Sequence, residues 1–137
     1  MDNQSIAHTR WNCTYHIVII PKYRRKIMYG QLKVEVSEVL KKLCEMSEAE
    51  LIEGKVCSDH VHMYIAIPPK LSVAKFMSYL KGKSALMLFD KHPEFRKKFG
   101  GRRNFWARGY YVTTVGNVNE STIVQYIRDQ EEKDKLE

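Results

Sequence analysis

The sequence predicts an α+β fold of the ferredoxin-like (RRM-like) type, in which an antiparallel sheet carries two helices on one face. Four segments rich in β-branched and aromatic residues alternate with two segments of helical periodicity, in the order strand, helix, strand, strand, helix, strand. A chain of 137 residues suits one domain with a substantial core. We therefore expect a single domain over residues 1–137, with its core at about 10–116 and an extra C-terminal helix at about 119–133 that contains Tyr126.

The first strand and first helix are predicted from composition and spacing. Residues 11–20 are aromatic and β-branched and should form one strand, which Pro21 ends. A basic loop, Lys22–Lys26, follows. Apolar side chains then recur every three or four residues between Leu32 and Met46, which predicts an amphipathic helix of about four turns that covers the sheet.

The second half of the predicted sheet is a hairpin. Residues 50–57 read as a strand, Ser58 and Asp59 are typical turn residues, and residues 60–67 form the returning strand before two prolines. Ser72 is a suitable N-cap for the second helix, whose apolar stripe runs to Leu88. Residues 110–115 are expected to form the fourth strand, and residues 120–132 the last helix.

The strand at residues 60–67 has two unlike faces. His60, His62 and Tyr64 alternate with Val61 and other apolar residues, so the two imidazoles point to the same side. The apolar side should meet the helices, and the histidine side, which lacks aliphatic residues, should be the open face of the sheet. Two histidines spaced in this way can bind one metal ion, although surface histidines with no ligand fit the same pattern.

Charge indicates a polyanionic partner. The net charge is +7, and residues 128–137 hold three basic and five acidic side chains, so the first 127 residues carry +9. The segment 92–108 interleaves cations with aromatic rings, which suits single-stranded nucleic acid; a solvated loop with buried aromatics is the alternative. We expect DNA contacts from basic and aromatic side chains here, in the loop after the first strand and on the second helix: Lys22, Arg24, Arg25, Lys81, Lys83, Arg102, Arg103 and Trp106.

The sequence disfavours a membrane protein and a secreted protein. No apolar run is long enough to cross a membrane, and the N-terminus lacks the pattern of a signal peptide. Three cysteines without paired spacing fit reduced thiols, so we expect a cytoplasmic protein, associated with the nucleoid when it binds DNA.

A phosphodiester can be cleaved by a divalent cation and an aligned nucleophile. His60 and His62 could hold the cation, and Tyr126 could attack the phosphorus, with Gln130 one helical turn away as a neutral oxygen ligand. Several residues compete for these roles. They are Tyr15, Tyr64, Tyr110 and Tyr111 as nucleophile, Asp129, Glu131 and Asp134 as ligand, and His16 as imidazole, although His16 lacks a partner two residues away.

The motifs together resemble the HUH endonuclease superfamily, and within it the single-tyrosine transposases of prokaryotic insertion sequences. The matching stretches follow in the family's order and cover nearly the whole chain: His60-Val61-His62 after Asp59, Leu80–Ser84, Phe105–Gly116 and Ile123–Gln130. His-x-His alone is a weak signal, whereas the four stretches together are specific.

The resemblance implies an enzyme that cleaves and rejoins single-stranded DNA at the ends of its element. Tyr126 would form a 5′-phosphotyrosine link, and His60, His62 and Gln130 would bind Mg²⁺ or Mn²⁺. The link conserves the energy of the broken bond, so no nucleotide cofactor is expected. The expected partners are imperfect DNA hairpins near the element ends and a second copy of the chain, in a homodimer whose active sites are shared between subunits.

Three other functions remain possible at this point. An RRM-like module would bind single-stranded nucleic acid without catalysis, using aromatic residues on its middle strands. A two-histidine phosphoesterase would use His60 and His62 as acid and base and would need no tyrosine. A replication-initiating or plasmid-mobilising nickase shares the site but is usually larger than 137 residues.

Overall fold

The computed structural model describes residues 4–6, 9–11, 13–98, 104–114, 125–126 and 128–129. Its named helices are η1 (Lys22–Arg24), α1 (Gly30–Met46), α2 (Val73–Lys91) and α3 (Glu94–Lys98). Its strands are β1 (Gln4–Ile6), β2 (Thr9–Trp11), β3 (Thr14–Ile19), β4 (Glu50–Val56), β5 (Val61–Ala66) and β6 (Tyr111–Thr114). Among the described residues, no helix is both long and apolar enough to cross a membrane.

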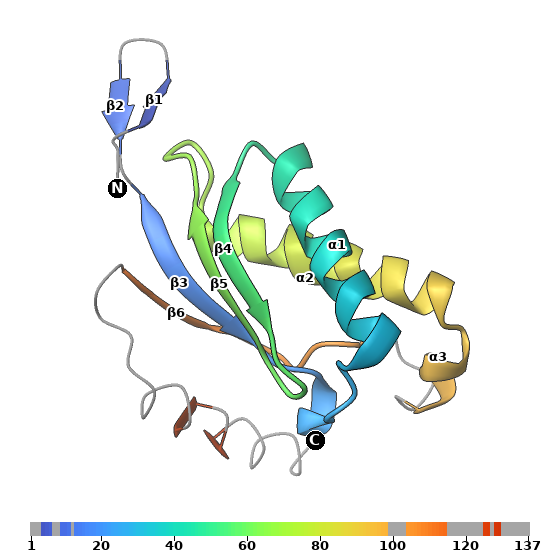
Figure 1. Cartoon of the computed structure of the whole chain (residues 1–137). Helices are drawn as coiled ribbons and strands as arrows, with labels where there is room; N and C mark the ends of the chain where they lie inside the picture. Colours follow the sequence, from blue (N-terminus) through green and yellow to red (C-terminus); the bar gives the residue numbers. More distant parts are fainter. Residues whose placement is uncertain are drawn as a thin grey trace.

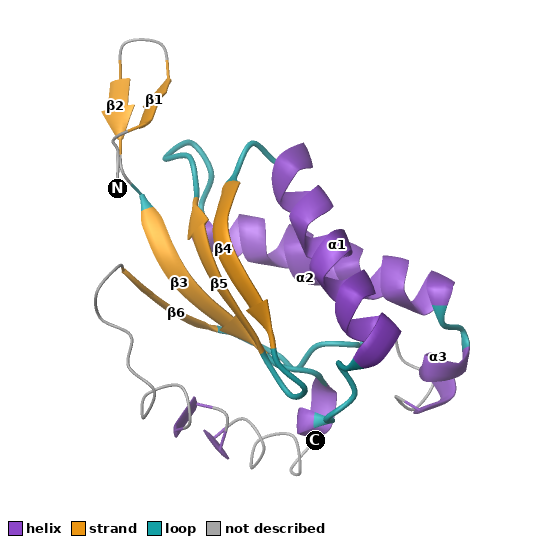
Figure 2. Ribbon diagram, viewed as in Figure 1, coloured by secondary structure: helices purple, strands orange, loops and turns teal. Residues whose placement is uncertain are grey.

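The main sheet has four antiparallel strands in the order β4-β5-β3-β6. Helices α1 and α2 cover the same face of this sheet (Figures 1 and 2). The core between the layers includes Ile17 and Ile65 of the middle strands, Val36 of α1 and Phe76 of α2, all of them fully buried. The ferredoxin-like α+β fold predicted from the sequence is therefore confirmed.

The strand predicted over residues 11–20 is confirmed only for β3, because Trp11 at its start belongs to β2. The described residues form two strands with different partners: β2 pairs with β1 in a separate two-stranded sheet, and β3 pairs with β5 and β6. This hairpin lies apart from the main sheet (Figure 1). Strand propensity continues through the whole segment, so composition cannot reveal where the chain changes its partner.

Both long helices, α1 and α2, agree with the helices predicted from the sequence. Helix α1 buries the apolar stripe that includes Leu32 and Leu43, and Ser72 caps α2 by accepting a hydrogen bond from the Lys75 amide at 3.1 Å. The short helix α3 was not predicted, because five residues are too few to show helical periodicity. The three cysteines are free thiols, as the sequence predicted.

The end of α2 is fastened to α1 by ionic contacts. The His92 imidazole contacts the Glu35 carboxylate through Nε2 and the Glu94 carboxylate through Nδ1, the latter at 3.2 Å. The ring also stacks on Phe95, with 5.0 Å between centroids. The hydrogen bond with Glu35 raises the pKa of His92, and the same bond lowers the pKa of Glu35. The charged pair is thus the favoured state of the folded protein.

This pair should make stability depend on pH. A histidine whose pKa is raised in the folded state stabilises the protein fully below about pH 6.5, and this stabilisation is lost as the pH rises through the folded-state pKa. A glutamate whose pKa is lowered in the folded state stabilises the protein above about pH 4.5, and this stabilisation is lost as the pH falls through the folded-state pKa. Replacing Glu35 with glutamine should therefore cost about 1 kcal/mol of unfolding free energy near pH 5.5, and less at pH 3 and pH 9. Chemical denaturation at each pH measures this difference.

Glu38→Gln is the matched control, because Glu38 is an exposed carboxylate of the same helix. Its effect should be small and similar across the same pH range. A Glu35→Gln cost that does not vary with pH would contradict an ionic role for the contact with His92.

Candidate functional site

The face of the sheet away from the helices collects the polar residues of the middle strands. In the strand pairing, His16 of β3 lies opposite Tyr64 of β5, and Val18 lies opposite His62. Tyr111 of β6 also lies opposite Val18. Directly paired residues of antiparallel strands point to the same side. We call this side the histidine face.

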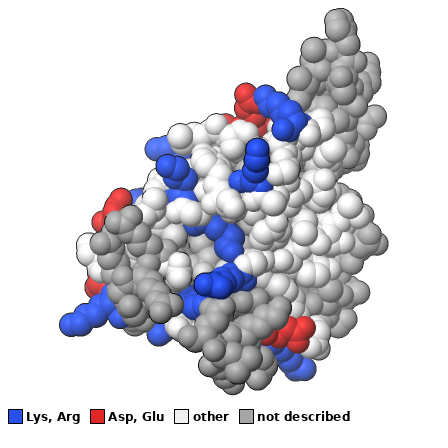
Figure 3. Space-filling view, turned by 180° about the vertical axis from the view of Figure 1, so that it is seen from behind, with Lys and Arg blue, Asp and Glu red and all other residues white. Residues whose placement is uncertain are grey.

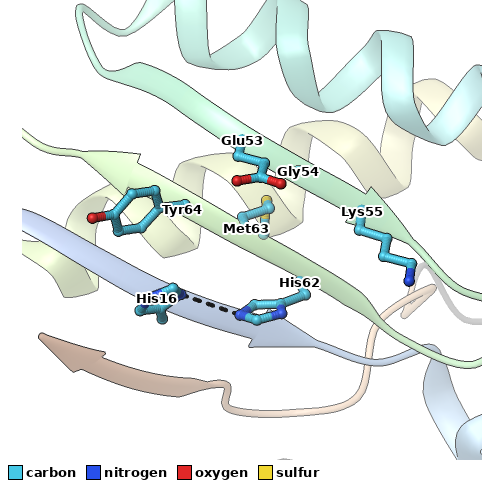
Figure 4. Close-up of a pocket in the computed structure, with 7 residues that line it drawn as sticks. All are labelled: His16, Glu53, Gly54, Lys55, His62, Met63 and Tyr64. Atoms are coloured by element: carbon cyan, nitrogen blue, oxygen red, sulfur yellow. Dashed lines mark hydrogen bonds between the residues drawn. The ribbon is translucent and has the colours of Figure 1, made fainter. Parts of the chain in front are cut away.

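The prediction that the whole histidine face is open is wrong at one end. Val18 and Ile20 are completely or almost completely buried there, and with Ala107 they form a small second core against which Tyr111 and Tyr126 pack. The residues of the strand at 60–67 suggested a face without aliphatics, but Val18 of β3 and Ile20, which follows β3, contribute aliphatic side chains to it. The other end is accessible: a hollow of about 160 Å³ lies beside His62 and is lined by His16, Glu53, Gly54, Lys55, Met63 and Tyr64 (Figure 4).

His62 has an unexpected partner in this hollow. Its Nε2 lies 3.2 Å from Nδ1 of His16, and the His16 ring stacks on Tyr64 with 4.6 Å between centroids (Figure 4). In sequence His16 seemed isolated because it has no histidine two residues away. The register of β3 against β5 supplies the partner instead, and spacing within one strand carries no sign of it.

His60 is held by its neighbour. It precedes β5 and lies at the end of a turn closed by a hydrogen bond from the Cys57 amide to the His60 carbonyl, at 2.8 Å. The His60 Nδ1 lies 2.9 Å from Oδ1 of Asp59. The turn position predicted for Asp59 is confirmed, and the structure adds this contact with the imidazole. A carboxylate on Nδ1 favours the tautomer that leaves Nε2 available as a ligand.

The imidazoles suit a metal ion. Burial lowers the pKa of His62, and the nearby imidazoles of His16 and His60 lower it further. A neutral ring is the form that binds a cation. Within the described residues, no cluster of three or more His, Cys, Asp or Glu side chains could hold a metal. The amide predicted as the third ligand, Gln130, lies outside the described residues.

Tyr126 belongs to the helical residues 125–126 and packs on the histidine face. Its ring lies 5.8 Å from that of Tyr111, and its hydroxyl oxygen is buried. The ring contacts the small core around Val18, and Val18 is the strand partner of His62. Tyr126 thus packs on the same face of the sheet to which His62 belongs.

Two of the rival tyrosines do not share this position. Tyr15 and Tyr110 pack against the main core between sheet and helices. Tyr64 and Tyr111 do lie on the histidine face, where Tyr64 stacks on His16 and Tyr111 sits beside Tyr126. Tyr64 and Tyr111 therefore remain the alternatives to Tyr126 as nucleophile, and an experiment must distinguish among the three.

Lys81 has a structural contact where the sequence predicted a phosphate contact. Its ammonium group donates to the Ala107 carbonyl at 2.7 Å and to the Gly109 carbonyl at 2.6 Å. Burial lowers the pKa of Lys81 to about 8. The side chain thus ties α2 to the loop that leads into β6, and in this conformation it does not point to a ligand.

Replacing Lys81 with methionine should destabilise the fold. The change removes two charge-assisted hydrogen bonds and leaves two carbonyls without that donor, which predicts a loss of about 2–3 kcal/mol in unfolding free energy. Lys83→Met is the control, because Lys83 is exposed on the same helix and its replacement should cost less than about 0.5 kcal/mol. Urea denaturation compares the two variants, and equal midpoints would contradict the role of Lys81.

Trp106 and Lys22, from which the sequence predicted DNA contacts, are both buried in this structure. Trp106 is only 5% exposed, and its Nε1 donates to the Ser84 hydroxyl at 2.8 Å, so its ring cannot stack on a base in this conformation. Lys22 is 4% exposed. For Trp106, the aromatic residue in the basic segment 92–108 belongs to the core. Phe105, which is fully buried, belongs to the same core.

Of the remaining residues predicted to contact DNA, the structure describes the side chains of only two. Lys83 is exposed on α2, and Arg25 is half-buried after η1. The side chain of Arg24, and all of Arg102 and Arg103, lie outside the described residues. Seen from behind, basic side chains run across the middle of the molecule, and the acidic ones visible in this view lie toward its rim (Figure 3).

The ferredoxin-like sheet, with His62 on a middle strand and Tyr126 packed on the same face, agrees with what the resemblance to the HUH endonucleases implied. The sequence over residues 9–130 matches the family of IS200-like transposases. The chain therefore belongs to this family, whose members cleave and transfer DNA strands during transposition.

Known relatives agree with this assignment. The transposase of insertion sequence element IS200 from Salmonella typhimurium is 51% identical over 135 residues, which covers 98% of this chain and 88% of the relative. The ISDra2 transposase TnpA from Deinococcus radiodurans is 29% identical over 120 residues, covering 88% and 85%.

Solved structures share the fold. A transposase from Deinococcus radiodurans superposes with a TM-score of 0.84 at 26% identity, over 93% of this chain and 97% of that one. A REP-associated tyrosine transposase bound to a REP hairpin gives a TM-score of 0.54 at 12% identity, over 90% and 68%. The second match supports the fold alone.

Proposed function

We propose that this transposase cleaves and rejoins single-stranded DNA at the ends of an insertion sequence, with Tyr126 as the nucleophile. The observation that supports this most directly is that Tyr126 packs on the small core of Val18, Ile20 and Ala107, in which Val18 is the strand partner of His62. A nucleophile and a pair of imidazoles on one face of a rigid sheet can act on one phosphate.

The proposed reaction consists of two exchanges at phosphorus. The Tyr126 hydroxyl loses its proton to solvent and its oxygen bonds to the scissile phosphorus, while the bond to the 3′ oxygen breaks and that oxygen takes up a proton. The products are a free 3′-hydroxyl and a 5′-phosphotyrosine. A 3′-hydroxyl then attacks the phosphotyrosine and releases the tyrosine, so the number of phosphodiester bonds is conserved and no nucleotide cofactor is needed.

In this proposal His60 and His62 hold Mg²⁺ or Mn²⁺, with Gln130 as the third protein ligand. Bound there, the divalent cation would neutralise charge on the phosphate and so favour nucleophilic attack. Support comes from the lowered pKa of His62, which keeps its imidazole neutral, and from Asp59, which leaves Nε2 of His60 available.

We further propose that DNA hairpins near the element ends are bound by basic side chains. Lys83 is suited to a phosphate contact because it is exposed on α2. Arg24, Arg25, Arg102 and Arg103 are kept in the proposal from the sequence. Lys22, Lys81 and Trp106 would need to leave their present contacts before they could reach DNA.

Labelled single-stranded DNA containing an element end tests the function directly. Incubation with Mn²⁺, followed by a denaturing gel, should show a protein–DNA adduct with the single strand and none with the matching duplex. An RRM-like binding module, the alternative function, would shift the same DNA in a native gel and form no adduct. Binding without cleavage under these conditions would therefore favour the alternative.

We propose that the active enzyme is a homodimer in which Tyr126 of one subunit acts with His60 and His62 of the other. Mixing a double variant, His60→Ala with His62→Ala, and a Tyr126→Phe variant should then restore cleavage, because each mixed dimer contains one intact site. Cleavage should approach one quarter of the wild-type level: mixed dimers are about half of a fully exchanged population, and each has one site of two.

Subunit exchange has to be verified in the same sample by differently tagged chains. Verified mixed dimers that remain inactive would contradict shared sites. Tyr126 packs against its own sheet in this structure, so sites built within one subunit are the specific alternative.

A further inference from the structure

Each imidazole of the candidate metal site contacts a second side chain through one of its ring nitrogens. His60 uses Nδ1, which lies 2.9 Å from the Asp59 carboxylate. His62 uses Nε2, which lies 3.2 Å from Nδ1 of His16. Histidines that bind metals usually donate their second N–H to such a partner, which fixes the tautomer and orientation of the ring. Asp59 is a familiar kind of partner, whereas a neutral histidine in this role has to be argued.

We propose that His16 is a positioning residue of this enzyme, which accepts a hydrogen bond from Nε2–H of His62 and so presents Nδ1 of His62 to the metal ion. The inference rests on the metal site of the proposed function. It assigns a role to a residue of β3 that lies outside the His-x-His motif.

The direction of the hydrogen bond follows from which His62 ring nitrogen each tautomer leaves available for the metal ion. If His62 donates from Nε2, its Nδ1 keeps a lone pair and can bind a cation. If His16 donates instead, the neutral His62 ring carries its proton on Nδ1 and has no nitrogen left for the metal. The two imidazoles also cannot both be charged at this distance without strong repulsion. Only the first arrangement of neutral rings is compatible with His62 as a ligand.

His16 is itself held in a fixed orientation, so it can restrict the orientation of the His62 ring. It belongs to the middle strand β3, paired on both sides by β5 and β6. Its ring lies nearly parallel to that of Tyr64, with an angle of 22° and 4.6 Å between centroids (Figure 4). Stacking and strand pairing together restrict the ring. The acceptor nitrogen is therefore fixed before any metal binds.

Two substitutions separate positioning from packing. His16→Phe keeps a flat ring against Tyr64 but removes the acceptor, whereas His16→Asn removes the ring and can place its amide oxygen near the position of Nδ1. Isothermal titration of the full chain with Mn²⁺ should show affinity reduced about 10- to 100-fold in His16→Phe and restored to within about 3-fold of wild type in His16→Asn. Long-range ¹H–¹⁵N NMR of metal-free wild type should show His62 with its proton on Nε2.

Circular dichroism confirms that each variant is folded before titration, and the NMR result gives a readout that is independent of cleavage. Wild-type Mn²⁺ affinity in folded His16→Phe would overturn the inference, and so would a metal-free His62 protonated on Nδ1. No Mn²⁺ binding by wild type would overturn the metal site itself and this inference with it. That outcome is distinguishable, because it is seen before any variant is compared.

Discussion

Tyr126→Phe should form no covalent adduct with single-stranded DNA, and its cleavage rate should fall at least about 10⁴-fold. Phenylalanine lacks the oxygen that would bond to phosphorus, and no neighbouring group replaces a lost nucleophile efficiently. The aromatic ring remains, so its packing against Val18, Ile20 and Ala107 should be preserved. Hairpin binding in a native gel should stay within about 3-fold of wild type, which separates loss of chemistry from loss of structure.

Tyr111→Phe is the matched control for this result. Tyr111 is the ring beside Tyr126, at 5.8 Å, and belongs to the same face of the sheet. It should keep most of its cleavage activity, as should Tyr64→Phe. An adduct that persists in Tyr126→Phe and disappears in either control would transfer the nucleophile to that residue and contradict the proposed reaction.

His60→Ala and His62→Ala should each reduce metal-dependent cleavage at least about 10³-fold, while the folded structure is retained. Loss of an imidazole removes a ligand of the proposed cation. Both side chains are half-buried on the histidine face and lie outside the main core, so we expect a small effect on unfolding. Cleavage of a labelled strand in Mn²⁺, with and without EDTA, measures the loss and its dependence on metal.

His92→Ala is the control for removing a histidine. His92 contacts Glu35 and Glu94 at the end of α2 and has no part in the proposed site. Its cleavage should stay close to wild type at neutral pH. Cleavage by wild type that continues in EDTA but is lost in both histidine variants would favour acid–base catalysis by His60 and His62, as in a two-histidine phosphoesterase.

The main sheet and its two helices could be predicted from the sequence because each element has a clear period. The alternation after His60 and the three-to-four spacing from Leu32 to Met46 both reflect burial on one side, and the structure has these residues in a strand and a helix. The first strand was predicted as one element because propensity does not identify the pairing partner. Hence the separate hairpin of β1 and β2 was missed.

The candidate site was predicted in part. The His-x-His spacing and the family motifs pointed to His60, His62 and Tyr126, and all three are present among the described residues. The contact of His16 with His62 depends on the register between two strands that lie 46 residues apart, which local spacing cannot show. The burial of Lys81 and Trp106 was not predicted, because a buried cation and a buried ring look the same in sequence as exposed ones.

The contacts of Ala107 connect the helical layer with the nucleophile. Its carbonyl accepts a hydrogen bond from Lys81 of α2, its amide donates to the Ile20 carbonyl at 2.8 Å, and its side chain belongs to the small core under Tyr126. Ala107 is therefore one point at which a displacement of α2 would reach the small core that supports the Tyr126 ring.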